Sequence, residues 1–165
     1  MVGSFCSRYA EGVSKVWAWG LVVGQFALII ALILFPAGSL WEKGVVVWVV
    51  AAVLFVVAGV VGILAGTRLG SNLTPNPIPK PDGTLETGGL YRYVRHPIYT
   101  AVLALALGFT TLGASLAHLV IFLILVMLLG TKARAEERLL RERFPDYREY
   151  QARVGRFIPR IGRIR

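Results

Sequence analysis

The segment YRYVRHPIYT, residues 91–100, concentrates side chains that could do chemistry. Arg92 and Arg95 carry fixed positive charges, and His96 can exchange a proton near neutral pH. Pro97 suits the first turn of a helix, so we expect a helix to begin there with His96 at or next to its cap. The free N–H groups of such a helix terminus, together with the two guanidinium groups, favour an anion such as a carboxylate or phosphate.

His96 and Tyr99 are three residues apart, which predicts that they share one face of this helix. A purely structural interpretation also exists. The arginines could be interfacial anchors, Tyr91, Tyr93 and Tyr99 an aromatic belt, and His96 a simple cap. The residue types of this segment leave both interpretations open.

A second polar cluster follows at residues 131–144, TKARAEERLLRERF. Its opposite charges recur three and four residues apart, which is typical of an exposed helix. That pattern does not account for the adjacent Glu136 and Glu137. Neighbours on a helix point about 100° apart, so one carboxylate can face solvent while the other turns inward. An inward carboxylate opposite the cations of residues 91–100 would make a bipolar site, suited to a zwitterion.

The elements that must position these clusters are membrane helices. Hydrophobic residues make up 56% of the 165-residue chain and charged residues 16%, values that indicate a membrane protein. A helix needs about 20 apolar residues to cross the hydrocarbon core. Residues 17–35 and 45–66 meet this requirement and predict two spans. A cleaved signal peptide is the alternative for the first run, which is longer than the core of about 7–15 residues typical of such peptides.

No charged residue occurs from 98 to 130, a stretch longer than one span needs. We therefore expect the chain to fold back, with the corner within residues 108–115, where Thr, Gly and Ser interrupt the apolar pattern. A helical hairpin returns its end to its beginning. Glu136 and Glu137 are thereby predicted to lie near Arg95 and His96.

The distribution of Lys and Arg predicts the orientation in the membrane. Residues 67–96 hold four basic residues, the tail from residue 131 holds eleven, and the connection between the first two spans holds Lys43. By the positive-inside rule the long loop, the tail and the N-terminus, with Arg8 and Lys15, are cytoplasmic. The protein is accordingly expected in a cytoplasmic or inner membrane, with its site facing the cytoplasm.

These expectations combine into an all-α integral membrane protein of about four membrane helices, two spans plus a helical hairpin, with a C-terminal cytoplasmic helical cap. One domain over residues 1–165 is expected, with the two spans in 1–66, a Pro-rich cytoplasmic loop in 67–96, the hairpin in 97–130 and a capping tail in 131–165. In the loop, Pro75, Pro77, Pro79 and Pro81 favour an extended connector. Such a connector either lines a site or merely links two helices.

Composition excludes some partners. The chain has one cysteine, Cys6, and two histidines, so we expect no metal site. The net charge of +9 is explained by membrane lipids, because cationic tails lie against anionic headgroups. Glutamates interleaved with the basic residues of the tail argue against nucleic-acid binding.

The chain carries the segment GGLYRYVRHPIYT, which is followed by an apolar hairpin, and then by EERLL and FPDYREYQARVGRFIPRI. In these motifs the chain resembles the integral-membrane methyltransferases of the isoprenylcysteine carboxyl methyltransferase and phospholipid methyltransferase superfamily. The resemblance covers roughly residues 67 to 160. It implies a methyltransferase that uses S-adenosylmethionine as cofactor and methylates a lipophilic acceptor from the bilayer. It implies further that Tyr91, Arg95, His96, Tyr99 and one or both of Glu136 and Glu137 contact the cofactor.

Within that resemblance, His96 and Arg95 are the candidate catalytic residues. A carboxylate acceptor, such as that of a prenylcysteine, is already ionised and needs no base. A lipid amine or a hydroxyl needs one, and His96 can serve. Leu90 stands where the family pattern has Pro, and the chain has fewer spans than the eukaryotic isoprenylcysteine enzymes. The sequence does not identify the acceptor.

A non-enzymatic membrane protein, such as a small transporter or an assembly subunit, is the alternative function. Transporters place charges at mid-membrane and show repeated halves. The sequence shows neither feature.

Overall fold

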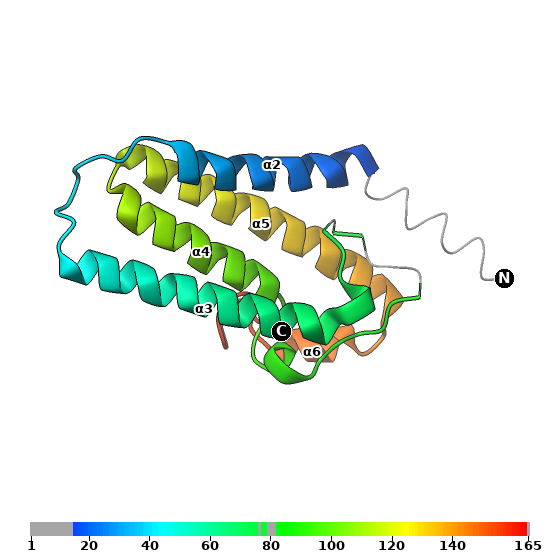
Figure 1. Cartoon of the computed structure of the whole chain (residues 1–165). Helices are drawn as coiled ribbons and strands as arrows, with labels where there is room; N and C mark the ends of the chain where they lie inside the picture. The colour runs from blue at the N-terminus through cyan, green and yellow to red at the C-terminus, as the bar shows by residue number, and fades with distance from the viewer. Residues whose placement is uncertain (1–14, 76, 79–81, 165) are drawn as a thin grey trace.

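The computed structural model describes residues 15–75, 77–78 and 82–164, and the regular structure of these residues is helical (Figure 1). The long helices are α2 (Lys15–Leu34), α3 (Val45–Leu69), α4 (Pro97–Gly113) and α5 (Leu116–Arg143), and the short ones are α6 (Tyr147–Arg153) and the 3-10 turns η1 (Gly70–Asn72) and η2 (Gly89–Arg92). Arg8, Cys6, Pro79 and Pro81, on which some predictions rest, lie outside the described residues.

Three of these helices are long and apolar enough to cross a membrane: Val16–Leu34, Val45–Asn72 and Leu116–Arg143. The hairpin's first arm, α4, is apolar but shorter. Large hydrophobic side chains on α2, α3 and α5 face outward, as lipid-facing positions require. The protein is an all-α integral membrane protein, and both predicted spans are confirmed.

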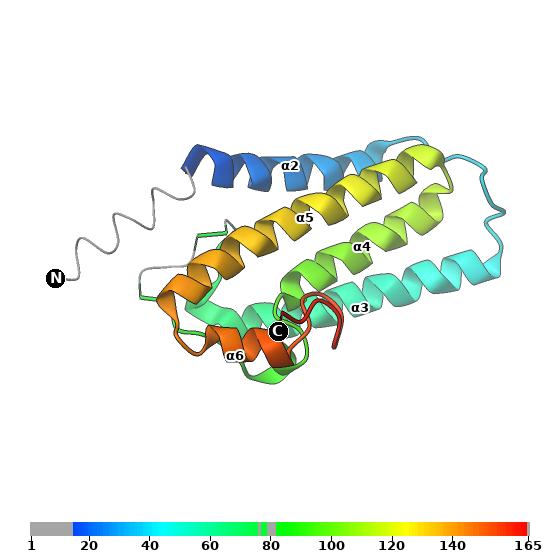
Figure 2. The same cartoon turned by 180° about the vertical axis from the view of Figure 1, so that it is seen from behind.

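The four long helices lie side by side in the order α2, α5, α4, α3 (Figures 1 and 2). Small residues allow α3 and α4 to approach closely. A Cβ on Gly62 of α3 would lie 3.6 Å from that of Ala101, and the ring of Phe55 packs directly over Gly108. On the other side of α4, Ala106 packs in a buried cluster with Leu125 and Leu129 of α5 and Leu32 of α2.

The predicted hairpin corner is confirmed at Ala114 and Ser115. Ala114 has a left-handed backbone (φ 44°) that ends α4, and the Ser115 side chain caps α5 by accepting from the His118 N–H. The connection between α2 and α3 meets this corner, because Gly38 N–H donates to Gly113 O (2.7 Å). Both turns therefore lie at the same end of the bundle (Figure 1).

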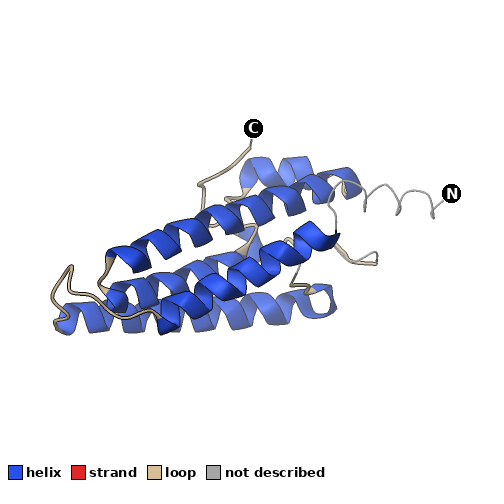
Figure 3. Cartoon of the chain, turned by 90° about the horizontal axis from the view of Figure 1, so that it is seen from above, coloured by secondary structure: helices blue, strands red, loops and turns tan. Residues whose placement is uncertain are grey.

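The opposite end of the bundle is shaped by the shortness of α4. Its 17 residues rise about 25 Å, against about 37 Å for the 25 residues of α3 and about 42 Å for the 28 of α5. Figures 1 and 2 show α3 and α5 extending past the start of α4, and Figure 3 shows the helical bundle from above. The loop after α3 and the C-terminal segment cover the resulting recess.

The C-terminal segment packs against residues 91–96 through backbone hydrogen bonds. Arg95 N–H donates to Gly155 O (2.8 Å) and His96 N–H to Arg156 O (3.1 Å). The Tyr150 hydroxyl donates to the carbonyl of Tyr91 (2.5 Å). Burial raises the pKa of the Tyr150 hydroxyl, so it keeps its proton and remains a donor at neutral pH. These bonds fix the backbone that carries Arg95 and His96.

Candidate functional site

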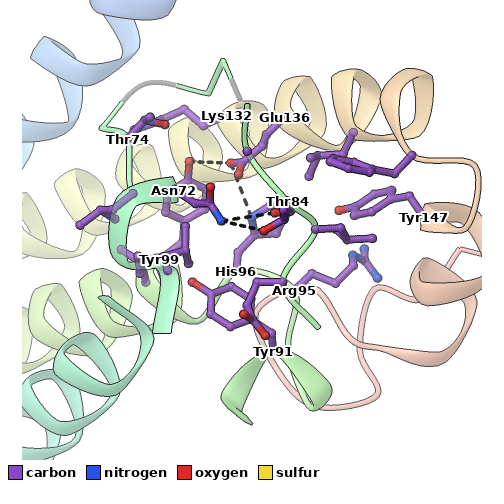
Figure 4. Close-up of a pocket in the computed structure, with 18 of the residues that line it drawn as sticks. Asn72, Thr74, Thr84, Tyr91, Arg95, His96, Tyr99, Lys132, Glu136 and Tyr147 are labelled. Atoms are coloured by element: carbon purple, nitrogen blue, oxygen red, sulfur yellow. Dashed lines mark hydrogen bonds and ion pairs between the residues drawn. The ribbon is translucent and has the colours of Figure 1, made fainter. Parts of the chain in front are cut away.

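A pocket of about 370 Å³ lies in the recess at the start of α4 (Figure 4). Its volume falls within the range of small-molecule sites, about 300–1,000 Å³. The pocket is bordered by five of the residues that the sequence singles out, namely Tyr91, Arg95, His96, Tyr99 and Glu136. The loop after α3 also lines it, over residues 72–75 and 83–86, so this connector is more than a linker.

Glu136 presents its carboxylate to the pocket. Its side chain is 30% exposed, and its Oε2 accepts a hydrogen bond from the Tyr99 hydroxyl (3.0 Å). The rings of His96 and Tyr99 stack, with centroids 5.2 Å apart and planes 5° from parallel. The predicted shared face of His96 and Tyr99 is thus confirmed. His96 also caps α4 with Pro97 in the first turn, as predicted.

Glu137 points the other way and does not border the pocket. Its side chain is 1% exposed. The carboxylate accepts from Arg95 Nε (3.0 Å), Arg156 Nη2 (2.8 Å) and His96 Nε2 (3.2 Å). The predicted juxtaposition of an inward glutamate with Arg95 and His96 is therefore confirmed. Contact of Glu137 with a cofactor remains a prediction, and its surroundings are those of a buried structural ion cluster.

Arg95 is enclosed by acceptors. Nη1 donates to the carbonyls of Gln151 (3.2 Å) and Val154, and Nη2 donates to Gly162 O (2.9 Å). Nε and Nη2 both approach Glu137 Oε1, at 3.0 and 2.9 Å. Nε, Nη1 and Nη2 each donate to an acceptor within the protein. Arg95 thus holds the C-terminal segment to the hairpin and also borders the pocket, and its contact with a cofactor stays a prediction.

The two ring nitrogens of His96 face different carboxylates. Nε2 lies 3.2 Å from Glu137 Oε1, and Nδ1 lies 3.7 Å from Glu136 Oε2. An ionised carboxylate can accept but not donate, so the shorter contact places a proton on Nε2. The Nδ1 atom on the Glu136 side is then the one that can take up a proton.

Tyr91 also lines the pocket. Its hydroxyl donates toward Ala65 O (3.5 Å), and burial, with the nearby Glu136 charge, raises its pKa. Arg92, the other arginine of the segment, is exposed and does not border the pocket. Among the described residues, no group of three or more His, Cys, Asp or Glu side chains could hold a metal ion.

Sequence reasoning missed Lys132, which borders the pocket and donates to Gln25 Oε1 (2.6 Å). A signal was present. Lys132 lies four residues before Glu136, at the end of the charge-free run, and Gln25 is the polar residue in the first apolar run. Arg156 was missed as well, because its proximity to Glu137 depends on how the C-terminal segment folds back.

Comparison with known proteins places these residues in a family. Residues 48–142 match the isoprenylcysteine carboxyl methyltransferase (ICMT) family. The cobalt-zinc-cadmium resistance protein CzcN of Cupriavidus metallidurans is 35% identical over 85 residues, covering 51% of this chain and 39% of CzcN. The uncharacterized protein C594.04c of Schizosaccharomyces pombe is 40% identical over 79 residues, covering 44% of this chain and 23% of that protein.

This chain thus aligns with less than half the length of either relative. No solved structure matches it. The family match spans more than half of the chain and includes η2, the hairpin and both glutamates. The protein belongs to the isoprenylcysteine carboxyl methyltransferase family.

Proposed function

We propose that the protein is a membrane-embedded methyltransferase that uses S-adenosylmethionine and methylates a lipophilic acceptor. The observation that carries this proposal is the carboxylate of Glu136, which faces a pocket of small-molecule size at the end of the hairpin where the family motifs meet. Family membership supports the reaction class. The pocket supports a soluble cofactor of moderate size.

The residues present suit this cofactor. Its methionine end carries an ammonium group, for which Glu136 offers a partly exposed carboxylate. Its adenosine end needs apolar and hydrogen-bonding surfaces. The pocket provides apolar contacts at Leu85 and Leu140 and polar groups at Asn72 and Thr84, whose side chains bond to each other (3.2 Å).

When bound, the cofactor supplies an electrophilic methyl group on a sulfonium sulfur. The protein's contribution is then mainly positioning and exclusion of water. Tyr99 holds the Glu136 carboxylate in place, and Glu137 holds the His96 ring with its Nδ1 atom toward the pocket side. An amine, hydroxyl or thiol acceptor would lose a proton, and His96 Nδ1 is the candidate base for it. A carboxylate acceptor would need no such step.

The acceptor is proposed to reach the pocket from the bilayer. Phe26 of α2 borders the pocket and is 54% exposed on a membrane-spanning helix. Leu73 also borders the pocket and is exposed. The pocket therefore meets an apolar surface on the α2 side, which suits a lipophilic acceptor such as a prenylcysteine-like carboxylate or a lipid amine.

The site is proposed to face the cytoplasm. The pocket lies at the end of the bundle that carries the loop after α3 and the C-terminal segment, and the sequence of residues 67–96 and 131–165 contains fifteen basic residues. The other end, at residues 35–44, carries Lys43 alone. This asymmetry follows the positive-inside rule.

A methyl-transfer assay tests the proposal. Membranes containing the protein are incubated with methyl-labelled S-adenosylmethionine and, in turn, a prenylcysteine analogue, phosphatidylethanolamine and an alkyl thiol. We expect label in the organic extract with at least one acceptor. With Glu136→Gln, the amount of label should be at least about tenfold lower. Glu149→Gln, an exposed glutamate outside the pocket, is the control and should retain activity. Label no higher than in membranes without the protein, for every acceptor, would contradict the proposal.

A further inference from the structure

Lys132 is a buried cation, and the hydrogen-bond and ring contacts of its ammonium with the described residues are to neutral groups. The residue is 1% exposed and borders the pocket. Its Nζ donates to Gln25 Oε1 (2.6 Å) and Pro75 O (3.1 Å) and lies 5.3 Å from the centre of the Tyr99 ring. Within the described part of the chain it forms no ion pair with a carboxylate. A buried ammonium is unfavourable unless an anion pairs with it, and a ligand in the pocket could provide that anion.

Glu136 stands one helical turn from Lys132 on the same face of α5. Side chains four residues apart on a helix have Cβ atoms about 5–6 Å apart. Tyr99 lies against both, because its ring faces Lys132 Nζ and its hydroxyl donates to Glu136 Oε2 (3.0 Å). Figure 4 shows Lys132 and Glu136 on one wall of the pocket, above His96 and Tyr99. The pocket thus presents the ammonium of Lys132 and the carboxylate of Glu136 side by side.

The other cations near the pocket do not fit this role. Each nitrogen of the Arg95 guanidinium already donates a hydrogen bond within the protein. Arg143 borders the pocket, but it lies seven residues from Glu136, a rise of about 10 Å along the helix, and donates to Gly83 O (2.9 Å). A ligand with an ammonium and a carboxylate group on one carbon atom suits the four-residue spacing of Lys132 and Glu136 better than the seven-residue spacing of Glu136 and Arg143.

We infer that Lys132 and Glu136 together bind the α-amino-acid zwitterion of the cofactor, Lys132 taking the carboxylate and Glu136 the ammonium. This inference rests on the proposed function, since the methionine portion of S-adenosylmethionine is such a zwitterion. It assigns to Lys132 the carboxylate-binding role that the sequence suggested for the helix terminus and the arginines of residues 91–100. Gln25 and Pro75 position the ammonium of Lys132 through its two hydrogen bonds.

The test is calorimetric titration of the full chain, purified in detergent, with three ligands. S-adenosylhomocysteine carries both charges, its carboxyl methyl ester lacks the negative charge, and 5′-methylthioadenosine lacks the amino-acid portion altogether. The variant is Lys132→Gln, which removes the charge and keeps a hydrogen-bond donor in the side chain. Arg143→Gln is the matched control, a pocket cation that the inference leaves without a role.

The wild type should bind S-adenosylhomocysteine at least about tenfold more tightly than the ester, the factor expected for a hydrogen bond to a charged group. Lys132→Gln should lose that preference. It should bind S-adenosylhomocysteine at least about tenfold more weakly than the wild type does. Its affinity for 5′-methylthioadenosine should stay within about twofold, which also shows an intact pocket. Arg143→Gln should keep the preference for the acid over the ester.

Two results would overturn the inference while leaving the proposed function in place. In one, Lys132→Gln discriminates between acid and ester as the wild type does. In the other, its affinity for 5′-methylthioadenosine falls as much as that for S-adenosylhomocysteine, so that Lys132 acts on the shape of the pocket alone. Failure of the wild type to bind either adenosyl ligand would instead remove the proposed function, and the inference with it.

Discussion

Replacement of Glu137 by Gln tests whether this carboxylate is the centre of the ion cluster beneath the pocket. The substitution preserves volume and removes one negative charge. Arg95, with a fully buried side chain, would keep its carbonyl acceptors but lose its counter-ion. Arg156 has a side chain that is 21% exposed and can turn toward water. The main penalty is therefore one uncompensated buried cation, for which breaking a buried ion pair typically costs about 3–5 kcal/mol.

For a chain of this size, 1 kcal/mol corresponds to a shift of about 2–4 °C in the unfolding midpoint, so we expect Glu137→Gln to lower Tm by about 6–20 °C. The assay is thermal unfolding of the detergent-solubilised protein, followed by circular dichroism. The control is Glu149→Gln, which breaks an exposed pair with Arg153 and should change stability by less than about 1 kcal/mol. Equal Tm values for the two variants would refute the view that Glu137 holds the C-terminal segment to the hairpin.

Three further predictions concern the scaffold around the site. Tyr150→Phe removes the hydrogen bond to Tyr91 O and should lower the free energy of unfolding by about 1 kcal/mol. Tyr93→Phe, at an exposed ring, is the control and should have little effect on this free energy. Chemical unfolding measures both. Gly155→Ala would place a Cβ 2.1 Å from Ile158 O, so faster amide hydrogen exchange is expected in residues 154–162, and unchanged exchange there would contradict this packing. In a Cys6→Ser background, a membrane-impermeant maleimide should label Lys43→Cys in intact cells. It should label Arg160→Cys only after the cells are permeabilised. The reverse pattern would show that the proposed orientation is wrong.

The fold could be predicted from the sequence because the membrane leaves few solutions. A charge-free run of the length found after Pro97 must turn back, and residues that break the apolar pattern locate the turn. The structure has the corner at Ala114, inside the predicted interval. The second arm continues without a break into the charged segment, since α5 runs from Leu116 to Arg143.

The proximity of the two glutamates to His96 was predictable for the same reason, but their division of labour was not. Side chains at adjacent helical positions point in different directions. The charge pattern alone does not indicate which of the two glutamates the C-terminal segment will cover. Glu137 is the buried residue because Arg156 returns to it from that segment. Glu136 is left facing the pocket.

Arg95 and Lys132 show which contacts the sequence does not indicate. Arg95 lies in the motif, and its contact with the cofactor stays a prediction. Its acceptors are largely backbone carbonyls of residues 151–162, which carry no signature in the sequence. Lys132 lies in the charge-rich segment of residues 131–144, whose pattern is typical of an exposed helix. Its burial depends on Gln25, more than a hundred residues earlier in the chain.

The central claim is that the pocket beside Glu136 binds the adenosyl cofactor, and equilibrium dialysis of S-adenosylhomocysteine against wild type and Glu136→Gln in lipid nanodiscs tests it most directly. We expect saturable binding by the wild type and an affinity at least about tenfold lower in the variant. Both proteins should unfold at the same temperature. Equal affinity in the two proteins, or no binding by the wild type, would contradict it.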